Sequence, residues 1–361
     1  LIMTLPEEHM REALSLAKKG LLTTRPNPLV GCVITHRNKV IGRGWHERAG
    51  QNHAEVNAIN DVHERLGESA KSVLKESEMF VTLEPCSTFG KTAPCADAIR
   101  KHGIKKVYIA SEDTSQDGFA IKEKNITIET GLLRDDAREI NKGFFSRIER
   151  KRPFITAKMG IGLDGGIALA SGESKWITSV QSREDVHKLR AINDAILTGV
   201  GTVLDDNPSL TSRDSGYDID KVIQPLRVVI DRNNKLTGKE EVFSDDAETI
   251  VFSNGDYDVN TSVAENIEYK NLINVMRHLA EEKQINNLLV EAGSGIFDAL
   301  LTENLIDCLI LYQSPKILGK NRKTFSKLNQ TDKKLSTMGF NIESIEHIGD
   351  DKKIIFKPNY S

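Results

Sequence analysis

Apolar and polar residues recur along the first part of the chain with two spacings, one typical of helices and one of strands. Segment 6–20 (PEEHMREALSLAKKG) places apolar side chains three and four positions apart, as an amphipathic helix does. Runs 29–35 (LVGCVIT) and 39–45 (KVIGRGW) are short and β-rich, and helical spacing returns at 53–67. The pattern predicts helices and strands that pack in layers.

A strand, a helix and a second strand follow in close succession. Residues 79–83 (MFVTL) form a continuous apolar run, 96–103 (ADAIRKHG) has helical spacing, and 105–110 (KKVYIA) is again apolar and β-rich. An intervening helix allows two strands to lie parallel, because it carries the chain back to the same end of the sheet. We therefore expect an α/β/α domain with at least one parallel crossover.

The basic stretch RIERKRP, residues 147–153, separates this pattern from a second one that restarts at Phe154. We place the domain boundary there, which gives domains at 3–147 and 153–361, with Met3 as the first residue. The second pattern is again α/β and ends in an antiparallel β tail. Its expected strands are 154–159, 195–199, 226–231, 249–253 and 287–292, and its expected helices are 182–194, 275–283 and one starting at Gly295.

Composition narrows the class of partner. The 49 Lys and Arg against 52 Asp and Glu give a net charge of −3, and the basic residues form no dense block, so we expect a small-molecule substrate and no nucleic acid. No apolar run approaches the length of a membrane span, and the first residues do not form a secretory leader. We expect a cytoplasmic protein with reduced cysteines and no membrane partner, and a homo-oligomer.

Two of the four cysteines carry the strongest chemical signal. Cys86 and Cys95 lie in PCSTFGKTAPC, residues 85–95, where each directly follows a proline. Upstream, HAEVNAIN supplies His53 and Glu55. A His-x-Glu followed by Pro-Cys and a second Cys is the pattern of zinc-dependent deaminases, in which one His and two thiolates hold Zn²⁺ and the Glu transfers protons. Three protein ligands leave the fourth zinc position open for water, as in a catalytic site.

Helix geometry constrains where this metal would lie. Residues two apart on a helix do not share a face, so His53 and Glu55 reach one metal only at the helix N-terminus. Cys95 likewise precedes an expected helix. The alternative is that both cysteines are small buried apolar residues and His53 caps a helix. Cys32 and Cys308 lie in apolar strands without a nearby His and are expected in the core.

Six segments, taken in order, identify a family. RPNPLVGCVI, HAEVNAIN, VTLEPCSTFGKTAPCADAI, GLDGGIALASGESKWITS, ILTGVGTVLDDNPSLT and VEAG together resemble the bifunctional riboflavin-biosynthesis deaminase/reductases over nearly the whole chain. The resemblance implies a cytidine-deaminase-like domain that binds zinc and deaminates 2,5-diamino-6-ribosylamino-4(3H)-pyrimidinone 5′-phosphate. It also implies a dihydrofolate-reductase-like domain that uses NADPH to reduce the ribosyl group to ribityl.

By the same resemblance, Asn27 would contact the pyrimidine and Lys91 the substrate phosphate. From the residues alone, Asn27 is equally well a turn residue between prolines and Lys91 a solvated loop charge. The chain departs from the family pattern at two places. Thr88 stands where the family has a His, and Ser115 lies where an Asp-Pro-Asn sequence usually follows strand 105–110.

The second domain contains two glycine-rich turns, which can be compared with known nucleotide-binding patterns. GVGTVL, residues 199–204, lacks the last glycine of a dinucleotide fingerprint because Leu204 occupies it, so we do not expect a Rossmann fold. Strand 287–292 leads into Gly293 and Gly295, whose following helix would bind a pyrophosphate at its N-terminus or simply form a strand-to-helix turn. Arg232, directly after strand 226–231, is a candidate for the NADPH 2′-phosphate, although a lone arginine there is often solvated.

The resemblance assigns further reductase residues. The NADPH-binding set is Gly160, Trp176, Thr202, Asp206, Gly293, Ser294, Gly295, Ile296, Phe297, Asp298 and Ala299. The phosphosugar set is Ser174, Arg190, Leu210, Arg213 and Glu291. The residues themselves show no general acid for the reduction.

Two other functions remain compatible with parts of the sequence. One is a nucleoside or tRNA-editing deaminase with an unrelated C-terminal module, which would favour a basic surface that this chain lacks. The other is a binding protein with a structural zinc and a nucleotide-sensing domain, against which Glu55 and the three-ligand zinc set argue.

Overall fold

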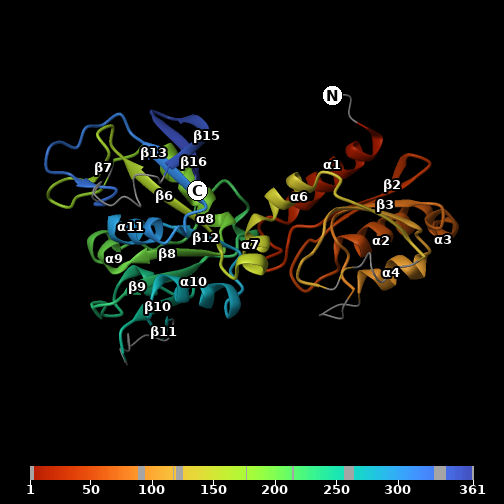
Figure 1. Ribbon diagram of the computed structural model, residues 1–361, viewed down its shortest axis with the longest axis horizontal. Coiled ribbons are helices and arrows are strands. Elements are labelled where there is room, and N and C mark those ends of the chain that lie inside the picture. The colour runs from red at the N-terminus through yellow and green to blue at the C-terminus, as the bar shows by residue number, and fades with distance from the viewer. Residues whose placement is uncertain are drawn as a thin grey trace. The chain divides into compact units, whose positions relative to one another are not determined.

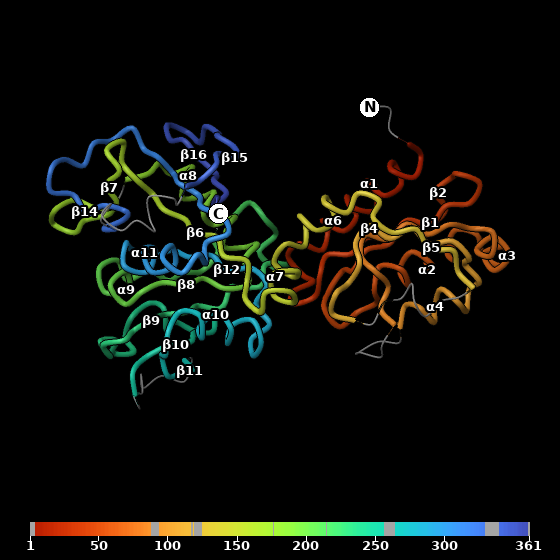
Figure 2. Tube along the Cα trace, in the orientation of Figure 1, coloured from red at the N-terminus to blue at the C-terminus, as the bar shows by residue number. Residues whose placement is uncertain are grey.

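The computed structural model describes residues 4–87, 94–116, 118, 125–175, 177–213, 215–255, 264–328 and 339–359. Thr88, Lys91 and Trp176, singled out above, lie outside these ranges. The chain divides into two compact units, Leu1–Arg150 and Lys151–Ser361, which we call the first and second unit (Figures 1 and 2).

The first unit is built around one mixed sheet. Within the described residues its five strands have the order β2-β1-β3-β4-β5. β1 is antiparallel to β2 and β3, whereas β4 is parallel to β3 and β5, which confirms the predicted crossover. Its strands are β1 (Gly31–His36), β2 (Lys39–Trp45), β3 (Glu78–Leu83), β4 (Lys106–Ser111) and β5 (Thr127–Thr130). Its helices are α1 (Leu5–Ala17), α2 (Ala54–Leu66), α3 (Ala70–Leu74), α4 (Cys95–His102), α6 (Arg134–Ile140) and α7 (Lys142–Arg150).

Helices cover both faces of this sheet, so successive side chains of a strand are buried on opposite sides. Cys32 and Ile34 of β1 pack with α2, α3 and α4, while Val33 packs with α1 and α6. Cys32 is fully buried, which confirms its predicted core position. This layering sets α2 and α4 on one face, and both helices begin close to the carboxyl end of β3.

The second unit has a larger sheet with an antiparallel end. The described strands are ordered β11-β10-β9-β8-β12-β6-β13-β16-β15. Pairing is parallel from β11 to β13 and antiparallel for β16 and β15, which confirms the predicted β tail. The strands are β6 (Phe154–Ile161), β7 (Gly166–Ala168), β8 (Ala195–Gly199), β9 (Leu226–Asp231), β10 (Thr249–Ser253), β11 (Ala264–Glu268), β12 (Asn287–Val290), β13 (Cys308–Gln313), β14 (Lys323–Thr324), β15 (Gly339–Ile348) and β16 (Asp351–Asn359).

Helices of the described residues cover both faces of this sheet. α10 (Leu272–Glu281) and α11 (Ser294–Thr302) pack on one face, and α8 (Val180–Ile192) and α9 (Val200–Asp206) pack on the other. Cys308 is buried in β13 among apolar neighbours, as predicted. In the ranges that the structure describes, no helix combines the length and hydropathy needed to cross a membrane.

Candidate functional site

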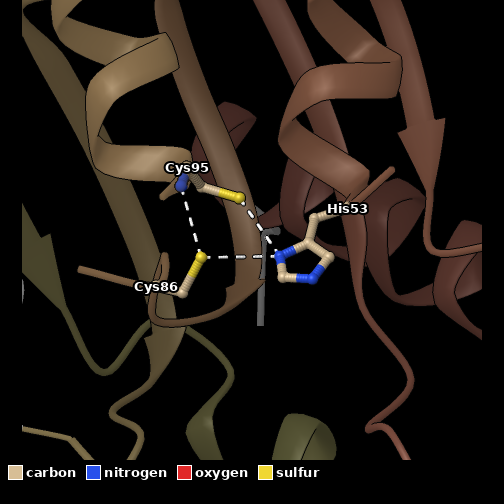
Figure 3. Close-up of side chains that lie close together, drawn as sticks. All are labelled: His53, Cys86 and Cys95. Atoms are coloured by element: carbon tan, nitrogen blue, oxygen red, sulfur yellow. Dashed lines mark hydrogen bonds between the residues drawn. The ribbon is translucent and has the colours of Figure 1, made fainter. Parts of the chain in front are cut away.

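Three side chains of the first unit converge on one point (Figure 3). The ligand-type atoms of His53, Cys86 and Cys95 all lie within 4.8 Å of one another. Nδ1 of His53 is 3.5 Å from Sγ of Cys86 and 3.3 Å from Sγ of Cys95. One imidazole nitrogen and two sulfur atoms at these distances can surround a single tetrahedral metal ion and leave a fourth position open.

Local structure explains why these residues meet. His53 is the N-cap of α2, Cys95 is the first residue of α4, and Cys86 follows β3 by three residues. The backbone N–H of Cys95 donates to Sγ of Cys86 over 3.2 Å. Helix N-termini favour thiolates because their unpaired N–H groups are partially positive. The predicted position at two helix starts is therefore what the structure shows.

The three side chains of this cluster shift one another's pKa values. Hydrogen bonds from the Cys95 thiol and from His53 lower the pKa of Cys86 to about 4 despite its burial. The same Cys86 sulfur, together with burial, raises the pKa of Cys95. The hydrogen bond to Cys86 also raises the pKa of His53. The lowered pKa of Cys86 favours its thiolate, and a bound metal cation would displace the thiol proton of Cys95.

Glu55 lies beside these ligands without being one of them. Its side chain is buried, and among the described residues no group hydrogen-bonds its Oε2 atom. Burial raises the pKa of Glu55 to about 7. A buried carboxyl with an unpaired oxygen and a pKa near neutrality can both take and give a proton, which fits the pattern of a zinc site with a proton-transferring Glu.

Asn27 is oriented by His46, a residue that the sequence reasoning missed. Nδ1 of His46 donates to the Asn52 carbonyl over 3.0 Å, so its Nε2 accepts from the Asn27 amide nitrogen, also at 3.0 Å. Burial lowers the pKa of His46, which favours this neutral form. Its ring also meets the His53 ring edge-on, with centroids 5.3 Å apart. The amide oxygen of Asn27 is thereby left for a partner other than His46.

Ser115, where the chain departs from the family pattern, is followed by Gln116, which contacts the segment that carries Cys86. Ser115 turns toward Asp113, to which its N–H and Oγ both donate. Oε1 of Gln116 accepts from the backbone N–H of Ser87, over 3.0 Å. Gln116 therefore braces the segment that carries Cys86.

The second unit contains a cavity of about 1030 Å³ at the carboxyl ends of its parallel strands. In open parallel sheets this edge is where ligands bind. The expected residues that line the cavity are Gly160, Ser174, Arg190, Thr202, Asp206, Leu210, Arg213, Arg232, Glu291, Gly293, Ser294, Gly295, Ile296 and Ala299. Of the expected residues that the structure describes, Phe297 and Asp298 are not part of the lining. Phe297 is instead buried in the core.

Charged side chains form a compact cluster in this cavity. Glu291, directly after β12, accepts from Nε and Nη2 of Arg190 at 2.6 and 3.0 Å. Nζ of Lys158 lies 2.8 Å from the same carboxylate. Burial alone would raise the pKa of Glu291, but the two cations overcome it and hold the pKa well below its usual range. The cluster is therefore one anion between two cations.

Lys158 is a second candidate functional residue that the sequence reasoning did not identify. It lies on β6, where alternate residues are buried, and its side chain is only 16% exposed. A lysine within a strand that is covered on both faces needs a partner, and that signal was available in the FITAKMG run.

Neighbouring residues connect the two expected binding sets. Ser174 Oγ donates to Asp206 over 2.7 Å, joining a phosphosugar residue to an NADPH residue. Leu210 is buried and has φ +50°, a left-handed conformation that costs energy for a residue with a branched side chain.

Arg232 lies at the cavity rim with its guanidinium 5.7 Å from the Tyr269 ring. The N-cap of α11 is Gly293, so the helix begins at Ser294, one residue before the predicted start at Gly295.

Family comparisons match both units. The cytidine and deoxycytidylate deaminase zinc-binding region matches residues 3–111, and the RibD C-terminal domain matches residues 153–354.

Full-length relatives are similar over almost the entire chain. The riboflavin biosynthesis protein RibD of Escherichia coli (strain K12) is 38% identical over 366 residues, covering 96% of this chain and 97% of the relative. RibD of Aquifex aeolicus (strain VF5) is 34% identical over 370 residues, covering 99% of each.

Solved structures show the same similarity over the full chain. Acinetobacter baumannii RibD is 33% identical with a TM-score of 0.90, covering 99% of each chain. A diaminohydroxyphosphoribosylaminopyrimidine deaminase/5-amino-6-(5-phosphoribosylamino)uracil reductase from Thermotoga maritima is 34% identical with a TM-score of 0.86, covering 98% of this chain and 99% of that one.

Proposed function

The chain belongs to the RibD family of bifunctional deaminase/reductases of riboflavin biosynthesis, and from this premise we propose which of its residues carry each reaction. Its deaminase domain binds zinc and its reductase domain binds NADPH. The predicted fold class, a cytidine-deaminase-like domain followed by a reductase domain, is confirmed. An unrelated C-terminal module is excluded, because the second unit matches the RibD C-terminal domain.

We assign the deaminase to residues 3–147 and the reductase to 153–361. The proposed substrate of the first is 2,5-diamino-6-ribosylamino-4(3H)-pyrimidinone 5′-phosphate, and the second reduces the ribosyl group of the deaminated product, giving 5-amino-6-ribitylamino-uracil 5′-phosphate. This proposal agrees with the activities named for the Thermotoga maritima relative. The observation that carries it is the His53, Cys86 and Cys95 cluster beside a buried Glu55 with an unpaired oxygen.

A direct assay tests the assignment. Purified protein given the diaminopyrimidine substrate should release one ammonia and then oxidise one NADPH per substrate. Release of ammonia without NADPH oxidation, at saturating NADPH, would contradict the second half of the proposal.

In the deaminase, His53, Cys86 and Cys95 would hold Zn²⁺. Zinc bound there would lower the pKa of a coordinated water so that it can attack the amino-bearing carbon. Glu55 takes the proton of that water through its unpaired oxygen and delivers it to the departing amine. Asn27, with its amide nitrogen held by His46, presents its carbonyl oxygen to an N–H group of the pyrimidine, and Lys91 binds the phosphate.

In the reductase, Gly160, Trp176, Thr202, Asp206 and the turn from Gly293 to Ala299 would hold NADPH. The N-terminal amides of α11 suit its pyrophosphate. NADPH, when bound, supplies the hydride for C1′ of the sugar.

Before the hydride arrives, the furanose ring has to open. The C1′–O4′ bond breaks, the exocyclic nitrogen donates its electron pair to C1′, and O4′ requires a proton. We assign this proton to Lys158, which lines the cavity and whose ammonium is held 2.8 Å from the Glu291 carboxylate, itself paired with Arg190. Glu291, together with Ser174, Arg190, Leu210 and Arg213, forms the proposed phosphosugar site.

Arg232 is proposed to select NADPH over NADH. Its guanidinium is exposed at the cavity rim beside Tyr269, where it can form a charge-assisted bond with the 2′-phosphate. Arg232→Ala should reduce the NADPH preference about tenfold, because bonds to charged groups contribute about 1.5–3 kcal/mol and this one is exposed to solvent. Ratios of kcat/KM for the two cofactors measure the effect. Arg277→Ala, at an exposed position of α10, should leave the ratio unchanged, and an unchanged ratio for Arg232→Ala would withdraw the assignment.

We also propose that the protein is a homo-oligomer that pairs through the edge of β15. Among the described strands β15 ends the sheet, and its Ile342 and Ile345 are 59% and 54% exposed. A long edge strand that exposes apolar side chains can pair with the same strand of a second chain. The double change Ile342→Lys and Ile345→Lys should yield monomers by light scattering, whereas Ile273→Lys on α10 should not. A monomeric parent protein would refute the proposal.

The proposed location is the cytoplasm, because zinc binding by Cys86 and Cys95 requires reduced thiols. Cell fractionation with an activity assay tests this location.

A further inference from the structure

Helix α8 presents one polar face to the reductase cavity. Arg183, Val186, His187 and Arg190 all line the cavity, and their spacing of three, four and seven residues places them on one face of the helix. The two arginines carry fixed charges. His187, between them, has a role in none of the assignments above.

The hydrogen bonds of His187 determine where its proton lies. Its Nδ1 accepts the backbone N–H of Arg213 over 3.0 Å. A neutral imidazole has one acceptor nitrogen and one donor nitrogen, so the proton is on Nε2. The ring is therefore a donor of fixed direction.

The surrounding charges favour this neutral form. Burial and the cations Arg190 and Arg213 lower the pKa of His187, and Glu291 and the Thr211 carbonyl oppose them only in part. The lowered pKa favours the neutral imidazole, whose Nε2–H is a donor that adds no positive charge to the cavity.

Arg190 is less available to a ligand than its sequence position implies. All three guanidinium nitrogens donate within the protein, two of them to Glu291 and Nη1 to the Thr211 carbonyl at 3.1 Å. The side chain of Arg213, by contrast, is exposed at the cavity. An anion that enters here meets Arg213 and His187 before it meets a guanidinium already engaged with a carboxylate.

We propose that His187 is a substrate-binding residue whose Nε2–H donates to the 5′-phosphate of the phosphosugar, next to the guanidinium of Arg213. This rests on the proposed reductase function and adds a residue to its substrate site. A neutral donor suits a site that already contains Arg190 and Lys158, since it adds a hydrogen bond without adding charge repulsion to the empty site.

A purely structural role for His187 has to be separated from this one. Its backbone carbonyl also accepts from Ser212 Oγ, over 2.8 Å, so the residue ties the 208–213 loop to α8. Two substitutions separate the acceptor function of Nδ1 from the donor function of Nε2. His187→Asn keeps an acceptor near the Nδ1 position for the Arg213 N–H but removes the distal donor. His187→Gln keeps a donor near the Nε2 position and removes the acceptor.

The test measures the reductase step on the deaminated substrate with and without its phosphate. His187→Asn should raise KM for the phosphorylated substrate about tenfold or more, with kcat within about twofold, because a lost bond to a charged group has about this effect. KM for the dephosphorylated substrate should stay unchanged. His187→Gln should retain most of the affinity for the phosphorylated form, and Glu184→Gln, at an exposed position of α8 outside the cavity lining, serves as the control.

A spectroscopic measurement reports on the same group directly. In ¹⁵N-labelled protein, His187 should show the Nε2–H tautomer, and ribose 5-phosphate should shift its Nε2 resonance. An unchanged KM in His187→Asn together with a raised KM in His187→Gln would overturn the proposal and leave His187 as a loop tie. Failure of the reductase assignment is a different result, since the parent protein would then not oxidise NADPH at all.

Discussion

Glu55→Gln is expected to reduce ammonia release by about a thousandfold or more while the protein still binds one zinc per chain. The amide has nearly the shape of the carboxyl but cannot accept and return a proton, and positioned acid–base groups contribute about 10²–10⁴-fold to a rate. Burial raises the pKa of Glu55 to about 7, so near neutral pH the group exchanges protons readily in both directions. Steady-state ammonia release, with zinc content measured on the same sample, gives the result.

Two controls accompany this variant. Glu64→Gln changes an exposed residue of the same helix and should leave ammonia release unchanged. NADPH oxidation on substrate that is already deaminated should persist in Glu55→Gln, because the reductase has its own site. Full deaminase activity in Glu55→Gln would show that another group transfers the proton.

Lys158→Met is expected to reduce kcat of the reductase by about 10²–10³-fold with little change in ammonia release. Methionine fills a similar volume but offers no proton for O4′. Glu291 would still be paired with Arg190 through two hydrogen bonds, so the buried carboxylate would keep a partner and the fold should survive. Single-turnover NADPH oxidation on the deaminated substrate measures the loss.

Lys158→Arg separates proton donation from charge. Arginine preserves the positive charge beside Glu291 but is a poor proton donor because its pKa exceeds about 12. It should therefore remain close to Lys158→Met in kcat. Recovery of most of the activity by arginine would mean that Lys158 acts through its charge alone, and Lys188→Met, at an exposed position of α8, should behave as the parent.

The sequence alone determined the zinc site because its information is local. His53, Cys86 and Cys95 each lie at the start of a helix or just after a strand, and hydrophobic spacing locates those ends without knowledge of the tertiary contacts. The same spacing predicted the parallel crossover, the closing antiparallel strands and the core positions of Cys32 and Cys308.

Only the tertiary structure showed that Lys158 belongs with Arg190 and Glu291 and that the three side chains contact one another. Lys158, Arg190 and Glu291 are far apart in the chain: the sheet order places β6 beside β12, and α8, packed on the sheet, adds Arg190. Neither their spacing nor their surroundings in sequence predicts that contact, since strand order depends on packing over the whole unit.

Side-chain orientation was likewise beyond the sequence. The amide direction of Asn27 depends on the tautomer of His46, and the proton position on His187 depends on a backbone N–H of a separate loop. Which atom of a side chain donates and which accepts depends on the group that lies within hydrogen-bond distance of it. Only the folded chain brings that group into place.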